Sequence, residues 1–397
     1  MPAKKRAQII DQRQVGAYHC YSRCVRRAFL AGVDWQTGQD FTYRRDWVRE
    51  RLEALASIFA IDVLDHAVME NHVHTILRNR PDSAKKLQRR EVAERWLRLS
   101  RKKLELNDRP AREDVDELLR DKSRMRKLRQ RLSDISWFMI MLNEPLALKA
   151  NIEDDMSGHF WAERFGSVRL ENDESLLACS LYVDLNPIRA GQCESIEAST
   201  YTGACDRLLD LEQERVAERA RRQRAVERIL EQSERRGEMP ELEATWSRLG
   251  GVVGAQLGAR DALVYGVMDI PGKRLAGVTP GTALTPHERS GWMSPLRVEG
   301  DGYEGAAQGR RASDLGYLPM DLEKYLVLLD ACGRQPIAGK RGSIPESAPD
   351  MISRLGLDPA RWTEEARRAA ERFARIGAQC ARQTAERQRG RAKKSHS

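Results

Sequence analysis

The stretch IDVLDHAVMENHVHTIL, residues 61–77, indicates the fold class most directly, because its apolar and β-branched residues predict strand structure. The residues before it, 46–59, carry apolar side chains at helical spacing, including Trp47, Leu52 and Phe59. Further upstream, the run YHCYSR at 18–23 is aromatic and β-prone. Strand and helix signals therefore alternate from residue 16 to residue 77.

The same alternation continues after residue 132. An apolar helix is predicted over 133–148, and the second half of GHFWAERFGSVRL, residues 158–170, has extended character. Asn172 or Asp173 caps another helix, which ends before Pro187. Strands and helices in this order predict a small α+β sandwich, a sheet with helices on one face.

The composition excludes several classes of protein. The chain has 397 residues, enough for two or three domains, and no apolar run approaches the length of about 18 residues that a membrane span requires. Its first residues, MPAKKRAQIIDQRQ, lack the apolar segment of a secretory signal. Seven cysteines without a metal-binding spacing predict reduced thiols and a cytoplasmic location.

The positive charge is concentrated in one segment. Residues 85–131 hold 18 basic and 9 acidic side chains, an excess equal to the net charge of +9 of the whole chain. We expect two charged helices around a turn near 107–110. If i,i+4 ion pairs are considered alone, these helices form a solvated hairpin. Because the segment interrupts the core, the working hypothesis is an arm that contacts nucleic-acid phosphates. The side chains assigned to those contacts are Arg124, Arg126, Lys127 and Arg129.

The chain is expected to divide into a split core and several appended segments. Residues 1–82 and 133–200 form the core, and the basic helical insertion at 83–132 lies between its halves. The appended segments are a charged helical spacer (201–249), a linker rich in Gly and Pro (250–310), a mainly helical accessory domain (311–380) and a basic tail (381–397).

Four side chains suggest a catalytic centre. His72 and His74 are two residues apart in a strand, so both imidazoles project from one face and could form half of a divalent-metal site. Tyr182 and Asn186 are four apart on a helix and also share a face. Each pair alone is weak evidence, because such residues are more often structural. Together, two imidazoles, an amide and a phenol fit the attack of a tyrosine on a phosphodiester beside a metal ion.

Four segments resemble the single-tyrosine HUH transposases, and most closely their REP-associated tyrosine transposase branch. They are YHCYSR (18–23), MENHVHTIL (69–77), GHFWAERF (158–165) and YVDLNPIRAG (182–191), and they occur in the family's order. The resemblance implies a ferredoxin-like antiparallel core with His72, His74 and Asn186 as metal ligands and Tyr182 as nucleophile. It further implies cleavage and rejoining of single-stranded DNA at hairpin or palindromic sites, through a covalent 5′-phosphotyrosine and with Mg²⁺ or Mn²⁺.

The chain departs from the family pattern at Glu70, where relatives commonly have proline. In a regular strand Glu70 shares the parity of His72 and His74, which makes it a possible third ligand in place of Asn186; the alternative is a tolerated substitution at the strand entry.

Arg23 and Arg189 flank the motifs and are candidate phosphate contacts, with surface salt bridges as the alternative. His19, His66 and His159 are interpreted as structural.

The expected protein is therefore a transposase-like enzyme that binds single-stranded or hairpin DNA in the bacterial cytoplasm, associated with the nucleoid when bound. A homodimer is possible, and neither membrane association nor a nucleotide cofactor is expected. The alternative is a domesticated DNA-binding protein that recognises palindromic hairpins without cleaving them. The basic helices do not distinguish DNA from RNA; only the family resemblance does.

Overall fold

A computed structural model describes residues 9–25, 31–34, 37–107, 109–236, 289–297 and 309–357. The chain divides into two compact units, residues 1–208 together with 290–397, and residues 209–289. The fold of the first unit is described below.

Four strands form one antiparallel sheet in this unit. They are β1 (Gly16–Arg23), β2 (Ile61–Val68), β3 (His72–Asn79) and β4 (Gly166–Leu170), and their order is β2-β3-β1-β4. The stretch 61–77, predicted to be extended, is a hairpin of β2 and β3 whose turn occupies residues 69–71. The prediction of an α+β fold is thereby confirmed, with an antiparallel sheet.

Two helices, α1 (Arg44–Ile58) and α6 (Ile135–Glu153), pack together on one side of the sheet. The alternation of side chains along β1 explains why: Tyr18 and Cys20 are fully buried in the main apolar core, together with Leu52 of α1 and Phe138 of α6. Asp134 starts α6 as its N-cap and accepts a hydrogen bond from the backbone N–H of Ser136.

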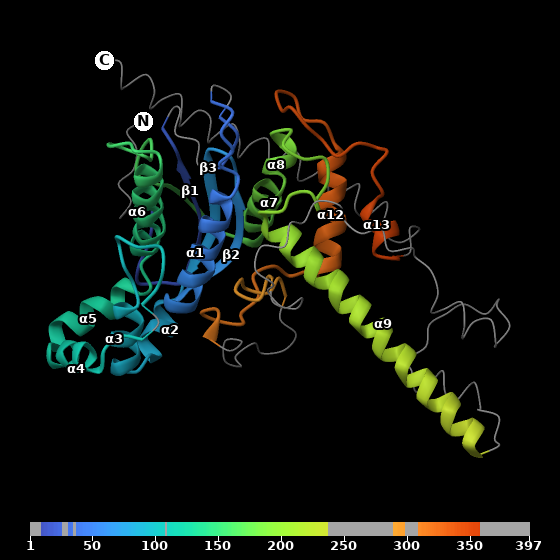
Figure 1. Ribbon diagram of the computed structural model, residues 1–397, viewed down its shortest axis with the longest axis horizontal. Helices are drawn as coiled ribbons and strands as arrows, with labels where there is room; N and C mark the ends of the chain where they lie inside the picture. The colour runs from blue at the N-terminus through green and yellow to red at the C-terminus, as the bar shows by residue number, and fades with distance from the viewer. Residues whose placement is uncertain are drawn as a thin grey trace. The chain divides into compact units, whose positions relative to one another are not determined.

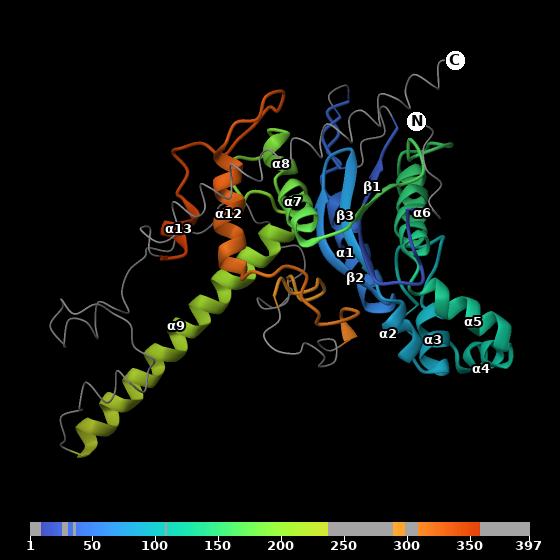
Figure 2. The ribbon, with the colours of Figure 1, turned by 180° about the vertical axis from the view of Figure 1, so that it is seen from behind.

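A third helix, α7 (Asp173–Asp184), covers the opposite side, so the prediction of helices on one face is wrong. Figures 1 and 2 show the sheet between α6 and α7, and α7 packs against β2, β3 and β4. The physical reason is that the second face also carries apolar and aromatic side chains, which must be shielded from water. Asn172 caps α7 by accepting a hydrogen bond from Ser175 N–H, and the short α8 (Asn186–Arg189) follows directly.

Among the described residues, the basic insertion and the two residues before it form four helices, where two were predicted. They are α2 (Pro81–Lys86), α3 (Arg89–Leu97), α4 (Arg112–Arg120) and α5 (Lys122–Arg131). The extra breaks have local causes, because Gln88 caps α3 with a capping box and Asp121 caps α5 by accepting from Arg124 N–H.

Residues 309–357 belong to the same compact unit as the sheet, whereas the sequence predicts an accessory domain at 311–380. They contain α12 (Leu322–Arg334), which lies beside α7 in both ribbon views, and α13 (Met351–Arg354). Helix α9 (Gly203–Arg236) covers much of the predicted spacer, whereas the basic tail and most of the predicted linker lie outside the described residues. None of the described helices is both long and apolar enough to span a membrane.

Candidate functional site

His72, His74 and Tyr182 lie together on the face of the sheet that α7 covers. The two imidazole rings are 4.8 Å apart, centroid to centroid, and nearly perpendicular. The ring of Tyr182 meets that of His74 edge to face at 5.6 Å. The fold therefore brings a phenol from α7 to a histidine pair on β3, which are distant in the sequence.

His74 is the buried member of the histidine pair, with 5% of its surface exposed. Its Nδ1 lies 2.9 Å from Nε2 of His19, which stacks on it from β1, and its own Nε2 has no hydrogen-bond partner among the described residues. Burial lowers the pKa of His74 well below its usual range, and the charges of His72 and His19 add to the effect. The ring is therefore neutral at pH 7, with a lone pair available at one nitrogen.

His72 is half-buried and is oriented by the residue before it. Its Nδ1 lies 2.6 Å from Oδ1 of Asn71 and donates to that oxygen, so its Nε2 carries the lone pair. Burial lowers the pKa of His72 to about 4, assisted by the positive charge of Arg23. Both histidines thus have the neutral form that metal binding requires.

Tyr182 and Asn186 are coupled along one turn of helix. The side-chain nitrogen of Asn186 donates to the backbone carbonyl of Tyr182 at 3.1 Å, which leaves the amide oxygen available. Burial raises the pKa of the Tyr182 phenol, and a hydrogen bond with the Asn186 side chain acts in the opposite direction. The phenol is therefore protonated at neutral pH.

Tyr21 is a residue of this site that sequence reasoning missed. It stands opposite His74 in the β1–β3 pairing, and the two rings are 6.2 Å apart. On its other side Tyr21 lies against Gly166 of β4, where an added Cβ would come within 2.2 Å of the tyrosine ring. The alternation in YHCYSR could have placed His19 and Tyr21 on one face, but the strand pairing that brings them to His74 is not visible locally.

Glu70 lies in the turn between β2 and β3, so the strand parity invoked for it as a possible ligand does not apply. Its exposed side chain packs against Gly32. Within the described residues, no three His, Cys, Asp or Glu side chains converge on a point where they could hold a metal. A metal at this site would therefore rely on the two histidines and on an amide oxygen.

The two arginines predicted to flank the site have different surroundings. Arg23 is exposed at the end of β1, opposite His72, and remains accessible to a ligand. Arg189 is buried, with 7% of its surface exposed, and its guanidinium donates to the carbonyls of Cys332 at 2.5 Å and Gln335 at 2.7 Å. Its charge is thus directed at the protein's own backbone.

The four basic residues predicted to contact phosphates lie on α5. Arg124, Arg126 and Lys127 are exposed there. Arg129 instead donates through one nitrogen to the carbonyls of Ala84, at 2.8 Å, and Leu87, at 2.5 Å. It therefore joins α5 to α2 and to the residue that follows α2.

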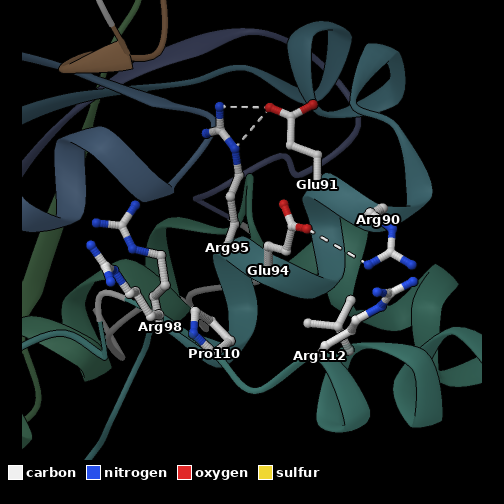
Figure 3. A pocket seen from close by; sticks show the side chains of 9 residues that line it. Arg90, Glu91, Glu94, Arg95, Arg98, Pro110 and Arg112 are labelled. Carbon is white, nitrogen blue, oxygen red and sulfur yellow. Dashed lines mark hydrogen bonds and ion pairs between the residues drawn. The ribbon is translucent and has the colours of Figure 1, made fainter.

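A second basic surface of the insertion is a pocket of about 500 Å³ between α3 and the start of α4. Arg95 pairs with Glu91 at 2.9 Å, and Arg90 pairs with Glu94 at 4.0 Å (Figure 3). Arg90 also pairs with Asp116, which is not part of the lining, at 2.6 Å. The side chain of Arg112 is 84% exposed. Five arginines and two glutamates share the lining, which makes the pocket cationic: Arg90, Glu91, Glu94, Arg95, Arg98, Arg109, Pro110, Arg112 and Val115.

Lys340 is a further site residue that the sequence did not reveal. It lies in the loop after α12, and its positive charge contributes to the lowered pKa of His72 and of His74, after the larger effect of burial. Its place beside histidines from β3 depends entirely on tertiary packing.

Comparisons of the chain with protein-family models, with curated proteins and with solved structures gave no match.

Proposed function

We propose that this chain is a DNA strand transferase of the single-tyrosine HUH type, with Tyr182 as its nucleophile. The observation that carries the proposal is the contact of Tyr182 with the His72–His74 pair, in which the ring of His74 lies 5.6 Å from that of Tyr182. The strand order β4-β1-β3-β2, with α1 between β1 and β2 and α6 between β3 and β4, supports a ferredoxin-like core of the kind expected for that family.

A divalent metal, Mg²⁺ or Mn²⁺, would be held by His72, His74 and the amide oxygen of Asn186. The fit is supported by the buried Nε2 of His74, which has no partner among the described residues, and by Asn71, which fixes the tautomer of His72. Bound there, the ion would polarise the scissile phosphate and offset its developing charge.

The protein's own groups then account for the covalent step. The hydroxyl oxygen of Tyr182 attacks phosphorus, a tyrosine O–P bond forms, and the bond from phosphorus to the 3′-oxygen breaks. The phenol loses its proton, and the leaving 3′-oxygen gains one and becomes a hydroxyl. Burial raises the pKa of Tyr182, so the phenol is protonated before the attack. In the reverse direction the 3′-hydroxyl attacks the phosphotyrosine, so rejoining needs no ATP.

The substrate's backbone is proposed to lie along the basic insertion and Arg23. The exposed residues of α5 and the arginine-lined pocket support this assignment, because guanidinium groups match phosphate oxygens in geometry and charge. Such an enzyme would act on hairpin or single-stranded DNA in the bacterial cytoplasm, as a monomer or a homodimer.

The test is the formation of a covalent adduct with a labelled single-stranded hairpin oligonucleotide in Mg²⁺ or Mn²⁺. We expect Tyr182→Phe to abolish the adduct, since the variant keeps the ring and lacks the attacking oxygen. Tyr43→Phe, which alters a tyrosine 40% exposed at the start of α1, is the matched control and should react as the wild type does. An adduct that survives in Tyr182→Phe would show that another residue is the nucleophile.

The second candidate is a protein that binds palindromic hairpins without cleaving them. It is favoured because, within the described residues, no three His, Cys, Asp or Glu side chains converge where they could hold a metal. Hairpin binding that persists in EDTA, with no nicking of the same oligonucleotide in Mn²⁺, would support this candidate over the enzyme.

A further inference from the structure

We propose that residues 309–357 complete the active site, by fixing the α7–α8 segment that carries Tyr182 and Asn186 and by supplying Lys340 as a contact to the substrate's phosphate. The inference rests on the proposed function, because it names further residues of the same site. Three sets of contacts carry it.

The first is an anchor on the side of α7 that faces away from the phenol. Asp184 follows Tyr182 by two residues, so its side chain leaves the helix in nearly the opposite direction. Asp184 is buried and accepts hydrogen bonds from the hydroxyl of Tyr325 at 2.5 Å and from the backbone N–H of Ala204 at 2.9 Å. Tyr325 is itself fully buried on α12. A charge-assisted bond between two buried side chains fixes α7 against α12.

The second set holds α8, which begins at Asn186. The buried guanidinium of Arg189 donates to the carbonyls of Cys332 and Gln335 at the end of α12. In return, the backbone N–H of Arg341 donates to the carbonyl of Arg189 at 3.1 Å. Residues from both sides of the contact therefore satisfy each other's polar groups.

Gly342 shows how closely the loop after α12 approaches α8. A Cβ added at this position would lie 2.2 Å from the carbonyl oxygen of Ile188 and 3.1 Å from the Cα of Gly191. Only glycine allows this backbone-to-backbone approach. The loop after α12 therefore packs directly against α8 and against Gly191, which lies shortly after it.

The third set concerns Lys340, which lies in the same loop, one residue before the Arg341 N–H that is bonded to Arg189 of α8. Its backbone N–H donates to the carbonyl of Ile337 at 3.0 Å, whereas its exposed side chain has no ion pair with any described residue. A cation without an ion pair among the described residues, on a loop bonded to the helix that begins at Asn186, suits the phosphodiester of the DNA.

The test measures the single-turnover rate of adduct formation on a labelled hairpin oligonucleotide in Mn²⁺. We expect Lys340→Met to lower this rate by about 100-fold, the lower end of the range seen when one charge-stabilising donor is removed. Lys340→Arg should recover most of it, because the charge is restored. Lys324→Met, which removes an exposed lysine of α12, is the matched control and should leave the rate unchanged.

The positioning role is tested with Tyr325→Phe, which keeps the buried ring and removes only the hydroxyl bonded to Asp184. Well below its unfolding temperature, this variant should bind the oligonucleotide as tightly as the wild type but react several-fold more slowly. A lowered unfolding midpoint with an unchanged rate would mean that Tyr325 serves stability alone. A Lys340→Met variant that reacts like Lys324→Met would remove Lys340 from the site.

Failure of the proposed function has a different outcome. In that case the wild type forms no adduct, and the phosphate contact of Lys340 is tested by hairpin binding instead. Lys340→Met should then lower the slope of log affinity against log salt by about 0.7, the value for one phosphate contact on single-stranded DNA. An unchanged slope, set against the Lys324→Met control, would overturn the contact as well.

Discussion

At the scale of single residues, the site is built from pairs that restrict each other. Tyr21 needs Gly166 beside it, His74 has His19 against one ring nitrogen, and His72 has Asn71. These neighbours are not the reacting groups, yet they decide which nitrogen of each imidazole is available for a ligand.

The contact between Tyr21 and Gly166 gives a prediction about stability. Gly166→Ala should destabilise the protein by about 1–3 kcal/mol, because the new Cβ would come within 2.2 Å of the Tyr21 ring. Urea denaturation measures the change. In a Tyr21→Ala background the same substitution should cost much less; an equal cost in both backgrounds would show that the ring is not what excludes the methyl group.

The buried carboxyl groups of Asp65 and Asp184 give a prediction about pH. Burial raises the pKa of Asp65 well above its usual range and the charge of Asp184 raises it further, while Arg207 opposes the shift. The groups around the pair come from α9 and α12: Arg207 lies 3.5 Å from Asp65, and Tyr325 donates to Asp184. Because the native state holds a proton that the unfolded chain loses near pH 4, the stability from this group is complete below that pH and is lost as the pH rises toward its native pKa.

The free energy of unfolding of the wild type should therefore fall by up to about 1.4 kcal/mol per pH unit above pH 4, relative to that of Asp65→Asn. The asparagine has no proton to lose, so the variant lacks this slope. Urea denaturation at a series of pH values checks the difference. Parallel pH profiles for the two proteins would mean that Asp65 is ionised in the native state.

At the residue scale, spacing alone was enough to single out four candidates. His72 with His74 and Tyr182 with Asn186 are local pairs, and the periods of strand and helix place each pair on one face. Lys340 could not be found in this way, since its position depends on a loop that packs only after distant segments have folded.

At the scale of elements, the insertion illustrates how weak local signals are for short helices. The helical content of 83–132 could be predicted from its composition, but the number of helices depended on caps at Gln88 and Asp121 that a charge count does not reveal. The α2–α5 group buries its own apolar side chains, such as Val92, Leu118 and Leu128, and leaves most of its basic ones exposed.

The difference between exposed and hydrogen-bonded basic side chains predicts which of them contribute to DNA binding. The triple variant Arg124→Gln, Arg126→Gln, Lys127→Gln should bind a hairpin oligonucleotide more weakly, with a salt slope reduced by about 2, because three exposed charges are removed. Arg129→Gln should mainly lower the free energy of unfolding, since its guanidinium is bonded to the carbonyls of Ala84 and Leu87. A triple variant with the wild-type slope would leave α5 as a solvated helix.

At the scale of the whole molecule, the predicted division into a core and a C-terminal accessory domain does not match the packing of residues 309–357. Arg78 and Arg80 of the core contact residues 313–316, through Leu315 O at 2.7 Å and Ser313 Oγ at 2.6 Å. Such contacts join segments more than two hundred positions apart, and no local pattern in the sequence predicts them.

If these segments form one cooperative structure, α7 and α12 should open together. In hydrogen-exchange measurements, peptides from 173–184 and 322–334 are expected to share one opening free energy, and Tyr325→Phe should lower it for both by about 1–3 kcal/mol. Protection lost only in 322–334 would instead mark α12 as an independently unfolding element.

The loop after α12 lies far downstream of α8 in the sequence, and this order has a consequence during synthesis of the protein. A ribosome completes α8 long before it reaches residue 342, and at about 5–20 residues per second the interval is roughly 8 to 30 seconds. During that time α8 lacks the backbone hydrogen bond from Arg341, and Lys340 is not yet present. Under the proposed function, a nascent chain would thus acquire its complete site only near the end of translation.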